Sequence, residues 1–287
     1  MTSRIAQLKI PPNWKNVTVA KSPLDYLQAT GYDAKGKMQY LYHPLFILLT
    51  TEDKYMRLKE FIGCLPIINK KLTKDFNAKC ISPEDTRKKM IAFLFKLLQK
   101  TFIRIGNQKY VRDNHTYGLT TLEKRHFKIV DKGILISFVG KRSISHNVLV
   151  DDPFLVKNLK ILLKKVPQGT SPVFCTKDSE GNLECIKATE MNEYLQEINE
   201  HFTYKDFRTY YSNLLFIEKL QKVPIGDPQK NLTKVVNHVY DYVADKFGHT
   251  KNISKKAYII PHIAEAFIEN PGYFKNKTPE NLLRALI

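Results

Sequence analysis

The spacing of apolar residues changes from strand-like to helix-like along the chain. Residues 1–50 place short alternating segments between prolines and glycines, as in KIPPNWKNVTVAKSP and GYDAKGKMQYLYHP, which is typical of strands joined by turns. From Glu52 onward, EDKYMRLKEFIGCLPIINKKL begins with acidic residues and spaces its apolar positions with a helical period. We therefore expect a β-rich N-terminal domain over 1–50 and a second domain over 51–287, with the boundary in LLTTEDK.

A further helix has a clear start signal at Ser82. This residue can cap the helix, Pro83 suits its first position, and Glu84 and Asp85 place negative charge where the helix dipole favours it. The pattern predicts one buried stripe, formed by Ile91, Leu94, Phe95 and Leu98. The helix is expected to end just before FIRIGNQKY, residues 102–110.

Three strands are expected in the middle of the chain. HFKIV, ILISFVG and ISHNVLV are rich in branched residues, and the turns DKG and KRS separate them. This antiparallel arrangement places Lys141 at the tip of a hairpin. Downstream, NLTKVVNHVYDYVADKF predicts an amphipathic helix that Gly248 terminates, so His249 follows a defined helix end. The expected fold class is α+β, a small β-rich domain followed by a mainly helical domain with a three-stranded antiparallel sheet.

The charge points to a polyanionic partner. The chain has 46 Lys and Arg against 28 Asp and Glu, a net charge of +18, and cations that neutralise phosphates gain affinity by releasing counterions. We find no apolar run of about 18 residues and no basic amphipathic tail, so nucleic acid is favoured over membrane. The N-terminus MTSRIAQLKIPPNW lacks the apolar core of a signal peptide, so we expect an intracellular protein.

The four cysteines are expected to be reduced and mostly buried. Cys64, Cys80, Cys175 and Cys185 lack CxxC spacing, and an intracellular chain of this size needs no disulfide framework. Cys175 and Cys185 flank the polar turn TKDSEGNLE, which could close a hairpin, but two thiols are too few for structural zinc.

Several catalytic motifs are absent from the sequence. There is no GxxxxGK[ST], GxSxG or HExxH, and no clustered Asp/Glu metal site. A chain of this kind that acts on phosphodiesters would therefore use neither metal nor nucleotide. It would need a nucleophile, cations on the non-bridging oxygens and an acid for the leaving oxygen. These requirements alone cannot select residues from 46 cations, because most Lys and Arg side chains are solvated surface charges.

Five segments in a fixed order resemble the type IB DNA topoisomerases, most closely their poxvirus and giant-virus branch. They are FIRIGNQKY, YGLTTL, SFVGKRSISH, YKDFRTYYSN and GHTKNISKKAY. The resemblance runs from about Lys9 to the C-terminus, and GKMQYLYH looks like that branch's groove-contacting strand. It implies the catalytic fold shared by tyrosine recombinases and type IB topoisomerases.

The resemblance assigns the core of an active site. It makes Tyr258 the nucleophile that forms a 3′-phosphotyrosyl link, and it places Arg104 and Arg208 where the family clamps the phosphate. His249 falls on the family's histidine that donates to a phosphate oxygen. Taken singly, Tyr258 could equally be a half-buried helix tyrosine, and His249 a histidine that interacts with a helix C-terminus.

Further residues follow from the same resemblance. Lys141 matches the lysine that protonates the 5′ leaving oxygen, Lys205 a second lysine that assists it, and Asn213 a position tied to the active site, which we group with the DNA contacts. The sequence departs from the branch at two positions. Arg142 stands where an acidic residue is more usual and could lower the pKa of Lys141, and Asn107 stands where a basic residue is common.

Other expected DNA contacts lie outside the chemistry. Gln39, Tyr40 and Tyr42 match family positions in the N-terminal domain that contact DNA, and Lys109 and Tyr110 follow the first arginine. A tyrosine pair in an alternating strand could instead be core on one side. The branch's preference for a short pyrimidine-rich site ending in CCTT is only implied.

The resemblance implies a DNA topoisomerase that nicks one strand of double-stranded DNA, allows rotation and reseals the nick, without metal, ATP or other cofactor. We expect a monomer that does not bind membranes and, if viral, resides in the virion and the host cytoplasm. Two alternatives remain, a tyrosine recombinase or integrase and a non-catalytic basic DNA-binding protein. A recombinase usually carries histidine three residues before its second arginine, where this chain has Lys205.

Overall fold

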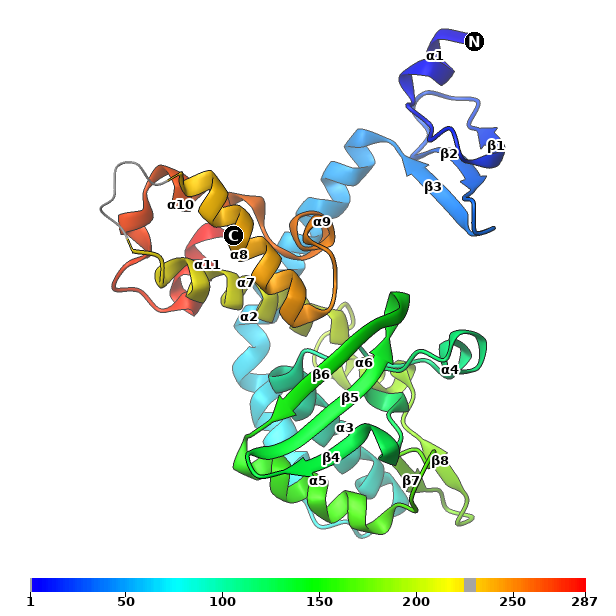
Figure 1. Ribbon diagram of the computed structural model, residues 1–287, viewed down its shortest axis with the longest axis vertical. Helices are drawn as coiled ribbons and strands as arrows, with labels where there is room; N and C mark the ends of the chain where they lie inside the picture. Colours follow the sequence, from blue (N-terminus) through cyan, green and yellow to red (C-terminus); the bar gives the residue numbers. More distant parts are fainter. Residues whose placement is uncertain (1, 225–230) are drawn as a thin grey trace. The chain divides into compact units, whose positions relative to one another are not determined.

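A computed structural model of the chain describes residues 2–224 and 231–287 (Figure 1). The chain divides into two compact units, Met1–Arg57 and Leu58–Ile287. Both units combine helices with small antiparallel sheets, which confirms the α+β class. Among the described helices, none is both long enough and apolar enough to span a membrane.

The N-terminal unit contains a three-stranded antiparallel sheet in the order β1-β2-β3. Its elements are α1 (Thr2–Gln7), β1 (Lys15–Val19), β2 (Leu27–Tyr32), β3 (Met38–Tyr42) and the start of α2 (Pro44–Asn77). Trp14 covers β2 so closely that a Cβ at Gly31 would lie 2.8 Å from the Trp14 ring. Arg4 ties α1 to this sheet by donating to the Gln28 side chain at 3.0 Å. The strand-rich prediction for this region is confirmed.

The long helix α2 begins earlier than the sequence pattern indicated. We expected helical structure from Glu52, but α2 starts at Pro44, because proline suits a first helical position and no turn residue follows before Glu52. The expected boundary at 50/51 therefore lies within an unbroken helix. Its buried residues all lie in the second unit, namely Leu58, Phe61, Ile62, Leu65, Ile68 and Leu72. The division into domains over 1–50 and 51–287 stays a prediction.

The second unit is mainly helical around an aromatic core. Phe61 meets the rings of Phe202 and Phe207 edge-on at 5.3 and 5.0 Å. The longer helices are α3 (Pro83–Thr101), α5 (Pro153–Lys165), α6 (Ala188–Gln196), α7 (Tyr204–Gln221), α8 (Leu232–Phe247), α10 (Pro261–Glu269) and α11 (Pro279–Leu286). The short ones are α4 (Gln108–Asn114), η1 (Leu119–Thr121), η2 (Lys124–His126), α9 (Lys251–Ile253), η4 (Ser254–Tyr258) and η5 (Pro271–Phe274).

The two helix ends predicted from sequence are both present. Ser82 caps α3 with a reciprocal bond to Asp85, and the predicted apolar stripe of α3 is buried. Gly248 ends α8 in the left-handed conformation, with φ of 62°. These ends form because their signals are local, a capping side chain in one case and a residue without Cβ in the other.

The predicted three-stranded sheet is also present, as β4 (Phe127–Val130), β5 (Gly133–Gly140) and β6 (Ile144–Val150). Gly140 pairs with Ile144 at the end of the β5–β6 ladder. This pairing leaves Lys141, Arg142 and Ser143 (η3) to make the tip of the hairpin, as expected. Helices α3 and α5 contact the sheet (Figure 1).

The prediction that all four cysteines are reduced is wrong for two of them. Strands β7 (Cys175–Lys177) and β8 (Leu183–Cys185) pair so that Cys175 lies opposite Cys185, and the two form a disulfide. The polar turn between them did close a hairpin, which brings the thiols together. Cys64 and Cys80 are free, but Cys80 is exposed rather than buried.

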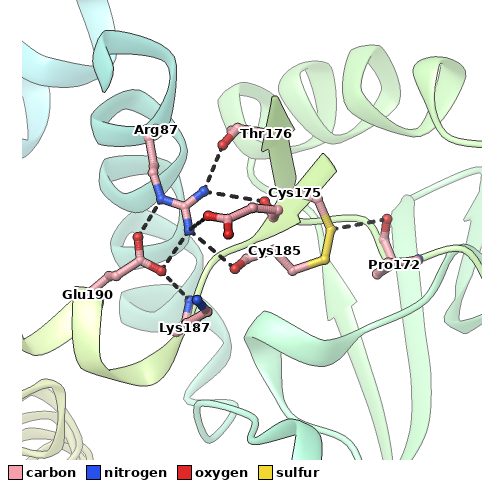
Figure 2. Close-up of a disulfide and its surroundings, with 8 residues drawn as sticks. Arg87, Pro172, Cys175, Thr176, Cys185, Lys187 and Glu190 are labelled. Atoms are coloured by element: carbon pink, nitrogen blue, oxygen red, sulfur yellow. Dashed lines mark hydrogen bonds and ion pairs between the residues drawn. A yellow bond between two sulfur atoms is a disulfide. The ribbon is translucent and has the colours of Figure 1, made fainter. Parts of the chain in front are cut away.

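Arg87 of α3 holds this hairpin to the rest of the unit (Figure 2). Its guanidinium pairs with the carboxylate of Glu190, donates to Thr176 Oγ1 at 3.0 Å and donates to the Cys185 carbonyl at 3.3 Å. The ion pair raises the pKa of Arg87, since hydrogen bonding to Glu190 outweighs burial. The disulfide therefore closes a hairpin that an ion pair already anchors.

His126 should make the stability of this unit depend on pH. Burial, and then the charge of Arg125, lowers its pKa to about 4. The folded pKa of His126 is below the unfolded one. Its contribution to the free energy of unfolding is therefore fully present above pH 6.5 and is lost as the pH falls toward 4. One such group contributes a slope of up to about 1.4 kcal/mol per pH unit.

Urea unfolding at pH 7 and pH 5 would measure this slope. The variant His126→Gln is expected to lose less stability than the wild type between the two pH values. His201→Gln is the control, because the His201 side chain is 69% exposed. An equal loss in the wild type and in His126→Gln would contradict the assignment.

Candidate active site

The structure brings together four of the six predicted catalytic residues from separate segments. Arg104 follows α3, Arg208 lies in α7, His249 follows the end of α8, and Tyr258 ends η4. These segments meet although Arg104 and Tyr258 are far apart in the sequence. Lys141, at the β5–β6 tip, contributes positive charge to the same group.

Arg208 is a buried and anchored cation. It is 3% exposed, and its guanidinium donates to the carbonyl of Phe102 and, at 2.9 Å, to the carbonyl of Phe247. Phe102 is the C-cap of α3 and Phe247 is the last residue of α8. Helix C-termini carry unsatisfied carbonyls and favour a cation, so these two helices hold the guanidinium in place. Its Nε is buried without a partner in the described part of the chain.

Arg104 is held in a similar way but is less buried. Its guanidinium donates to the carbonyl of Gly248 at 2.8 Å, so the loop that ends α8 anchors it. Burial, with the neighbouring charge of Arg142, lowers the pKa of Arg104. Burial likewise lowers the pKa of Arg208, to about 10. Arg208 therefore stays charged at neutral pH.

The rings of His249 and Tyr258 are stacked. Their centroids are 4.8 Å apart with an interplanar angle of 3°, and the guanidinium carbon of Arg208 lies 5.6 Å from the Tyr258 ring centroid. Burial, and then the charge of Arg208, lowers the pKa of His249 to about 4. Its Nε2 is buried and has no partner among the described residues. The imidazole is thus neutral, with one nitrogen available to a ligand.

Tyr258 has an acidified hydroxyl. Burial raises its pKa, but the charge of Arg208 and a hydrogen bond to it, with the charges of Arg104 and Lys141, outweigh burial and lower the pKa below the usual tyrosine value. A phenol whose oxygen lies among fixed cations is more readily deprotonated and is therefore a better nucleophile. The surrounding cations could also hold an anionic group that approaches this oxygen.

The backbone around Tyr258 has an unusual turn. Residues 254–258 form a π-helical turn, in which the Ile259 amide donates to the Ser254 carbonyl at 2.9 Å. Such turns are rare and occur mostly at functional sites. Asn213 holds the end of the turn, because its side chain donates to the Tyr258 carbonyl and accepts from the Ile260 amide, each at 2.9 Å.

Asn213 is buried beside the candidate nucleophile. It is 0% exposed, and both ends of its amide are engaged by backbone. Asn213 lies five residues beyond Arg208 on α7, and its side chain meets the backbone of Tyr258 and Ile260. Its grouping with the DNA contacts stays a prediction.

The remaining predicted residues lie at the surface. Lys205 is exposed in the first turn of α7, three positions before Arg208, a spacing that places both on one helix face. Lys109 and Tyr110 are exposed in α4. Arg142 is also exposed and has φ of 65° at the hairpin tip.

The tyrosines of β3 are not core residues. Tyr40 is 50% and Tyr42 37% exposed, and their rings stack with centroids 6.2 Å apart. Gln39 points to the other side of the strand, where its side chain donates to Asp33 at 2.9 Å. One face of β3 thus presents two aromatic rings to solvent. On the other face, the Gln39 side chain is hydrogen-bonded to Asp33.

Asn107 serves the fold in place of the basic residue that is common there. Its side chain caps α4 by accepting from the Lys109 amide at 2.8 Å. This explains why a short polar residue suits the position. Among the described residues, no group of three or more His, Cys, Asp or Glu could hold a metal ion.

Sequence reasoning missed His146 of β6. Its ring stacks on Phe138 with centroids 4.8 Å apart, and a Cβ added to Gly248 would lie 2.1 Å from its Cε1. A Cβ added to Gly140 would lie 2.7 Å from its Nε2. His146 therefore fills the space between the hairpin that carries Lys141 and the loop that carries His249. His146 is the last residue of the segment SFVGKRSISH, and its place in this motif could have marked it as a residue near the site.

Comparisons with known proteins show the family to which the chain is related. Residues 48–278 match the family model for the catalytic core of eukaryotic DNA topoisomerase I, and residues 1–33 match the model for the N-terminal domain of bacterial DNA topoisomerase IB. DNA topoisomerase 1B of Acanthamoeba polyphaga mimivirus is 31% identical over 295 residues, which cover 99% of this chain and 86% of that protein. DNA topoisomerase 1B of vaccinia virus (strain Copenhagen) is 29% identical over 270 residues, covering 91% and 80%.

A solved structure also resembles the chain. The XerH site-specific recombinase, in a post-cleavage complex with a palindromic difH substrate, aligns with a TM-score of 0.43 and 12% identity. The alignment covers 85% of this chain and 60% of that one.

Proposed function

We propose that this chain, which belongs to the type IB DNA topoisomerase family, relaxes supercoiled DNA by cutting one strand with Tyr258. The family assignment explains the net charge of +18, because the substrate is duplex DNA. The observation that carries the residue assignment is the Tyr258 hydroxyl, whose pKa is lowered by Arg208, Arg104 and Lys141.

The cleavage step forms one bond and breaks one. Tyr258 loses its phenolic proton to solvent and its oxygen attacks the phosphorus, so a 3′-phosphotyrosyl ester forms while the bond from phosphorus to the 5′ oxygen breaks. Lys141 gives its proton to that oxygen, assisted by Lys205, so the leaving group departs as a hydroxyl. Rotation of the free end releases supercoils, and the reverse step reseals the strand. The ester preserves the bond energy, so neither ATP nor metal is required.

The two arginines and His249 stabilise the charge that develops on the phosphate. Arg208 and Arg104 are anchored to backbone carbonyls before DNA arrives, so little reorganisation is needed in the transition state. Among the described residues, Nε of Arg208 and Nε2 of His249 are buried without a partner, so both can bond to the non-bridging oxygens. Arg142 adds positive charge next to Lys141 at the hairpin tip and near Arg104.

Further DNA contacts come from the surface residues. Tyr40, Tyr42, Lys109 and Tyr110 are exposed, as contact with phosphate or bases requires. Gln39 can also contact DNA if its side chain gives up the hydrogen bond to Asp33 and forms one with the edge of a base. The chain acts as a monomer inside the cell, and in a virus it would be found in the virion and the host cytoplasm.

Gly248→Ala should slow DNA cleavage on the order of 10²-fold, the loss expected when catalytic groups shift by about 1 Å. Gly248 has φ of +62°, and an added Cβ would lie 2.1 Å from His146. The substitution would displace both the carbonyl that anchors Arg104 and the adjacent His249. Gly36→Ala is the control, since Gly36 has φ of +70° with nothing within 4 Å of an added Cβ. Equal single-turnover rates for the two variants would contradict the packing role.

Plasmid relaxation tests the proposed function against its rivals. The protein is incubated with supercoiled plasmid in EDTA without ATP, and relaxed topoisomers are expected. Exchange between paired sites without relaxation would indicate a recombinase. A gel shift with neither relaxation nor covalent adduct would indicate a non-catalytic DNA-binding protein.

A further inference from the structure

The hydroxyl of Ser254 lies inside the active site and has no role in the steps above. Ser254 is 0% exposed at the start of η4, and its Oγ lies 3.5 Å from Nδ1 of His249. The carbonyl oxygen of Thr250 lies 3.3 Å from the same nitrogen. Nδ1 thus has one neighbour that can donate a hydrogen bond and another that can only accept one.

These two neighbours favour different tautomers of His249. If Nδ1 carries the proton, it donates to the Thr250 carbonyl, and Nε2 is left as a bare acceptor. If the Ser254 hydroxyl donates to Nδ1, the proton is on Nε2. Only the second tautomer can donate to a phosphate oxygen, because a neutral imidazole has a single N–H.

Protonation of the whole ring does not remove this choice at neutral pH. Arg208 and Arg104 face His249 from α7 and from the segment after α3, and their positive charges oppose a second proton. Tyr258 stacks on the ring from η4, and His146 of β6 packs against the adjacent Gly248. The tautomer therefore decides whether Nε2, which is buried and unpartnered in the described part of the chain, can serve as a donor.

We propose that Ser254 is a positioning residue that donates to Nδ1 and holds His249 in the tautomer with its proton on Nε2. The inference rests on the proposed role of His249 as a donor to the scissile phosphate. Hydrogen bonds at catalytic sites are often long in free enzymes and shorten when substrate binds. The separation of 3.5 Å fits such a contact, and Ser254 is the first residue of the π-helical turn that ends at Tyr258.

Nitrogen-15 NMR of the free protein tests the tautomer without DNA. With ¹⁵N-labelled histidine, the His249 signals are identified by their loss in His249→Gln. The wild type is expected to show the proton on Nε2, and Ser254→Ala is expected to show it on Nδ1. A wild type with the proton on Nδ1, or no change in Ser254→Ala, would overturn the inference while leaving the proposed function intact.

Single-turnover cleavage tests the consequence for catalysis. Ser254→Ala is expected to cleave roughly tenfold more slowly at pH 8, the effect of one lost neutral hydrogen bond. The difference should shrink as the pH falls toward 4, where His249 becomes protonated, because a protonated imidazole donates from both nitrogens. A tenfold loss that is the same at every pH would indicate a merely structural role and overturn the inference.

Two further variants make this test specific. Ser212→Ala is the matched control, because Ser212 is also 0% exposed and its hydroxyl donates to the Thr209 carbonyl within α7. It should cleave like the wild type. In a His249→Gln background, Ser254→Ala should have no further effect, since the glutamine amide donates without a tautomer choice. A full tenfold loss in that background would show that Ser254 does not act through His249.

Discussion

Replacing Tyr258 by phenylalanine is expected to abolish DNA cleavage and leave DNA binding unchanged. Phenylalanine keeps the ring that stacks on His249 at 4.8 Å and lies beside Arg208, so the site should keep its shape. It lacks the oxygen whose pKa the surrounding cations lower. Without that nucleophile, cleavage should fall at least about 10⁴-fold.

The measurement is formation of the covalent protein–DNA adduct in a single turnover, with binding followed separately by gel shift. Tyr242→Phe is the matched control. Tyr242 lies in α8, where Lys219 and Lys246 contact its ring, and it has no proposed role in the chemistry. Adduct formation by Tyr258→Phe at the wild-type rate would mean that another residue is the nucleophile.

Arg208→Ala is expected to reduce cleavage on the order of 10²–10³-fold or more while DNA binding is largely kept. The substitution removes a cation that lies beside the Tyr258 ring and that we propose holds the phosphate. It also leaves the carbonyls of Phe102 and Phe247 without their donor, which should cost about 1–3 kcal/mol of unfolding free energy for each buried group. Arg104→Ala should lose a similar factor in rate with a smaller loss of stability, because Arg104 donates to one carbonyl.

Arg208→Lys separates charge from geometry. Lysine keeps the positive charge but cannot span two carbonyls and still reach the phosphate, so cleavage should remain slow. Cleavage rates at saturating DNA and thermal unfolding would be measured together. Arg125→Ala is the control, since Arg125 is half exposed and pairs with Glu123. A variant that binds DNA poorly but cleaves at the normal rate once bound would refute the clamp role of Arg208.

Local signals explain which parts of the fold could be predicted. The cap at Ser82, the end of α8 at Gly248 and the tip at Lys141 each depend on a few neighbouring residues. The start of α2 was missed because apolar residues after Pro44 fit a strand as well as a helix. The disulfide was missed because the pairing of Cys175 with Cys185 depends on strand register, and composition says nothing of register.

Ordered motifs in the sequence proposed the candidate site residues but could not give the contacts that hold them. The arginine anchors are carbonyls of Phe102, Phe247 and Gly248, and no sequence pattern marks a backbone carbonyl as an acceptor. The burial of Asn213 and the tautomer choice at His249 likewise follow from how α7, the end of α8 and η4 meet. The sequence could propose which residues form the candidate site. The backbone groups that hold those residues were visible only in the folded structure.

The central claim is that Tyr258 becomes covalently linked to DNA, and peptide mapping of the adduct tests it most directly. The protein is incubated with duplex DNA in EDTA, the reaction is stopped with denaturant, and the adduct is digested with protease and nuclease. Mass spectrometry is predicted to find nucleotide attached to the peptide that contains Tyr258, through a 3′ phosphate. Nucleotide attached to another residue, or a DNA strand cut without any attachment, would contradict the account.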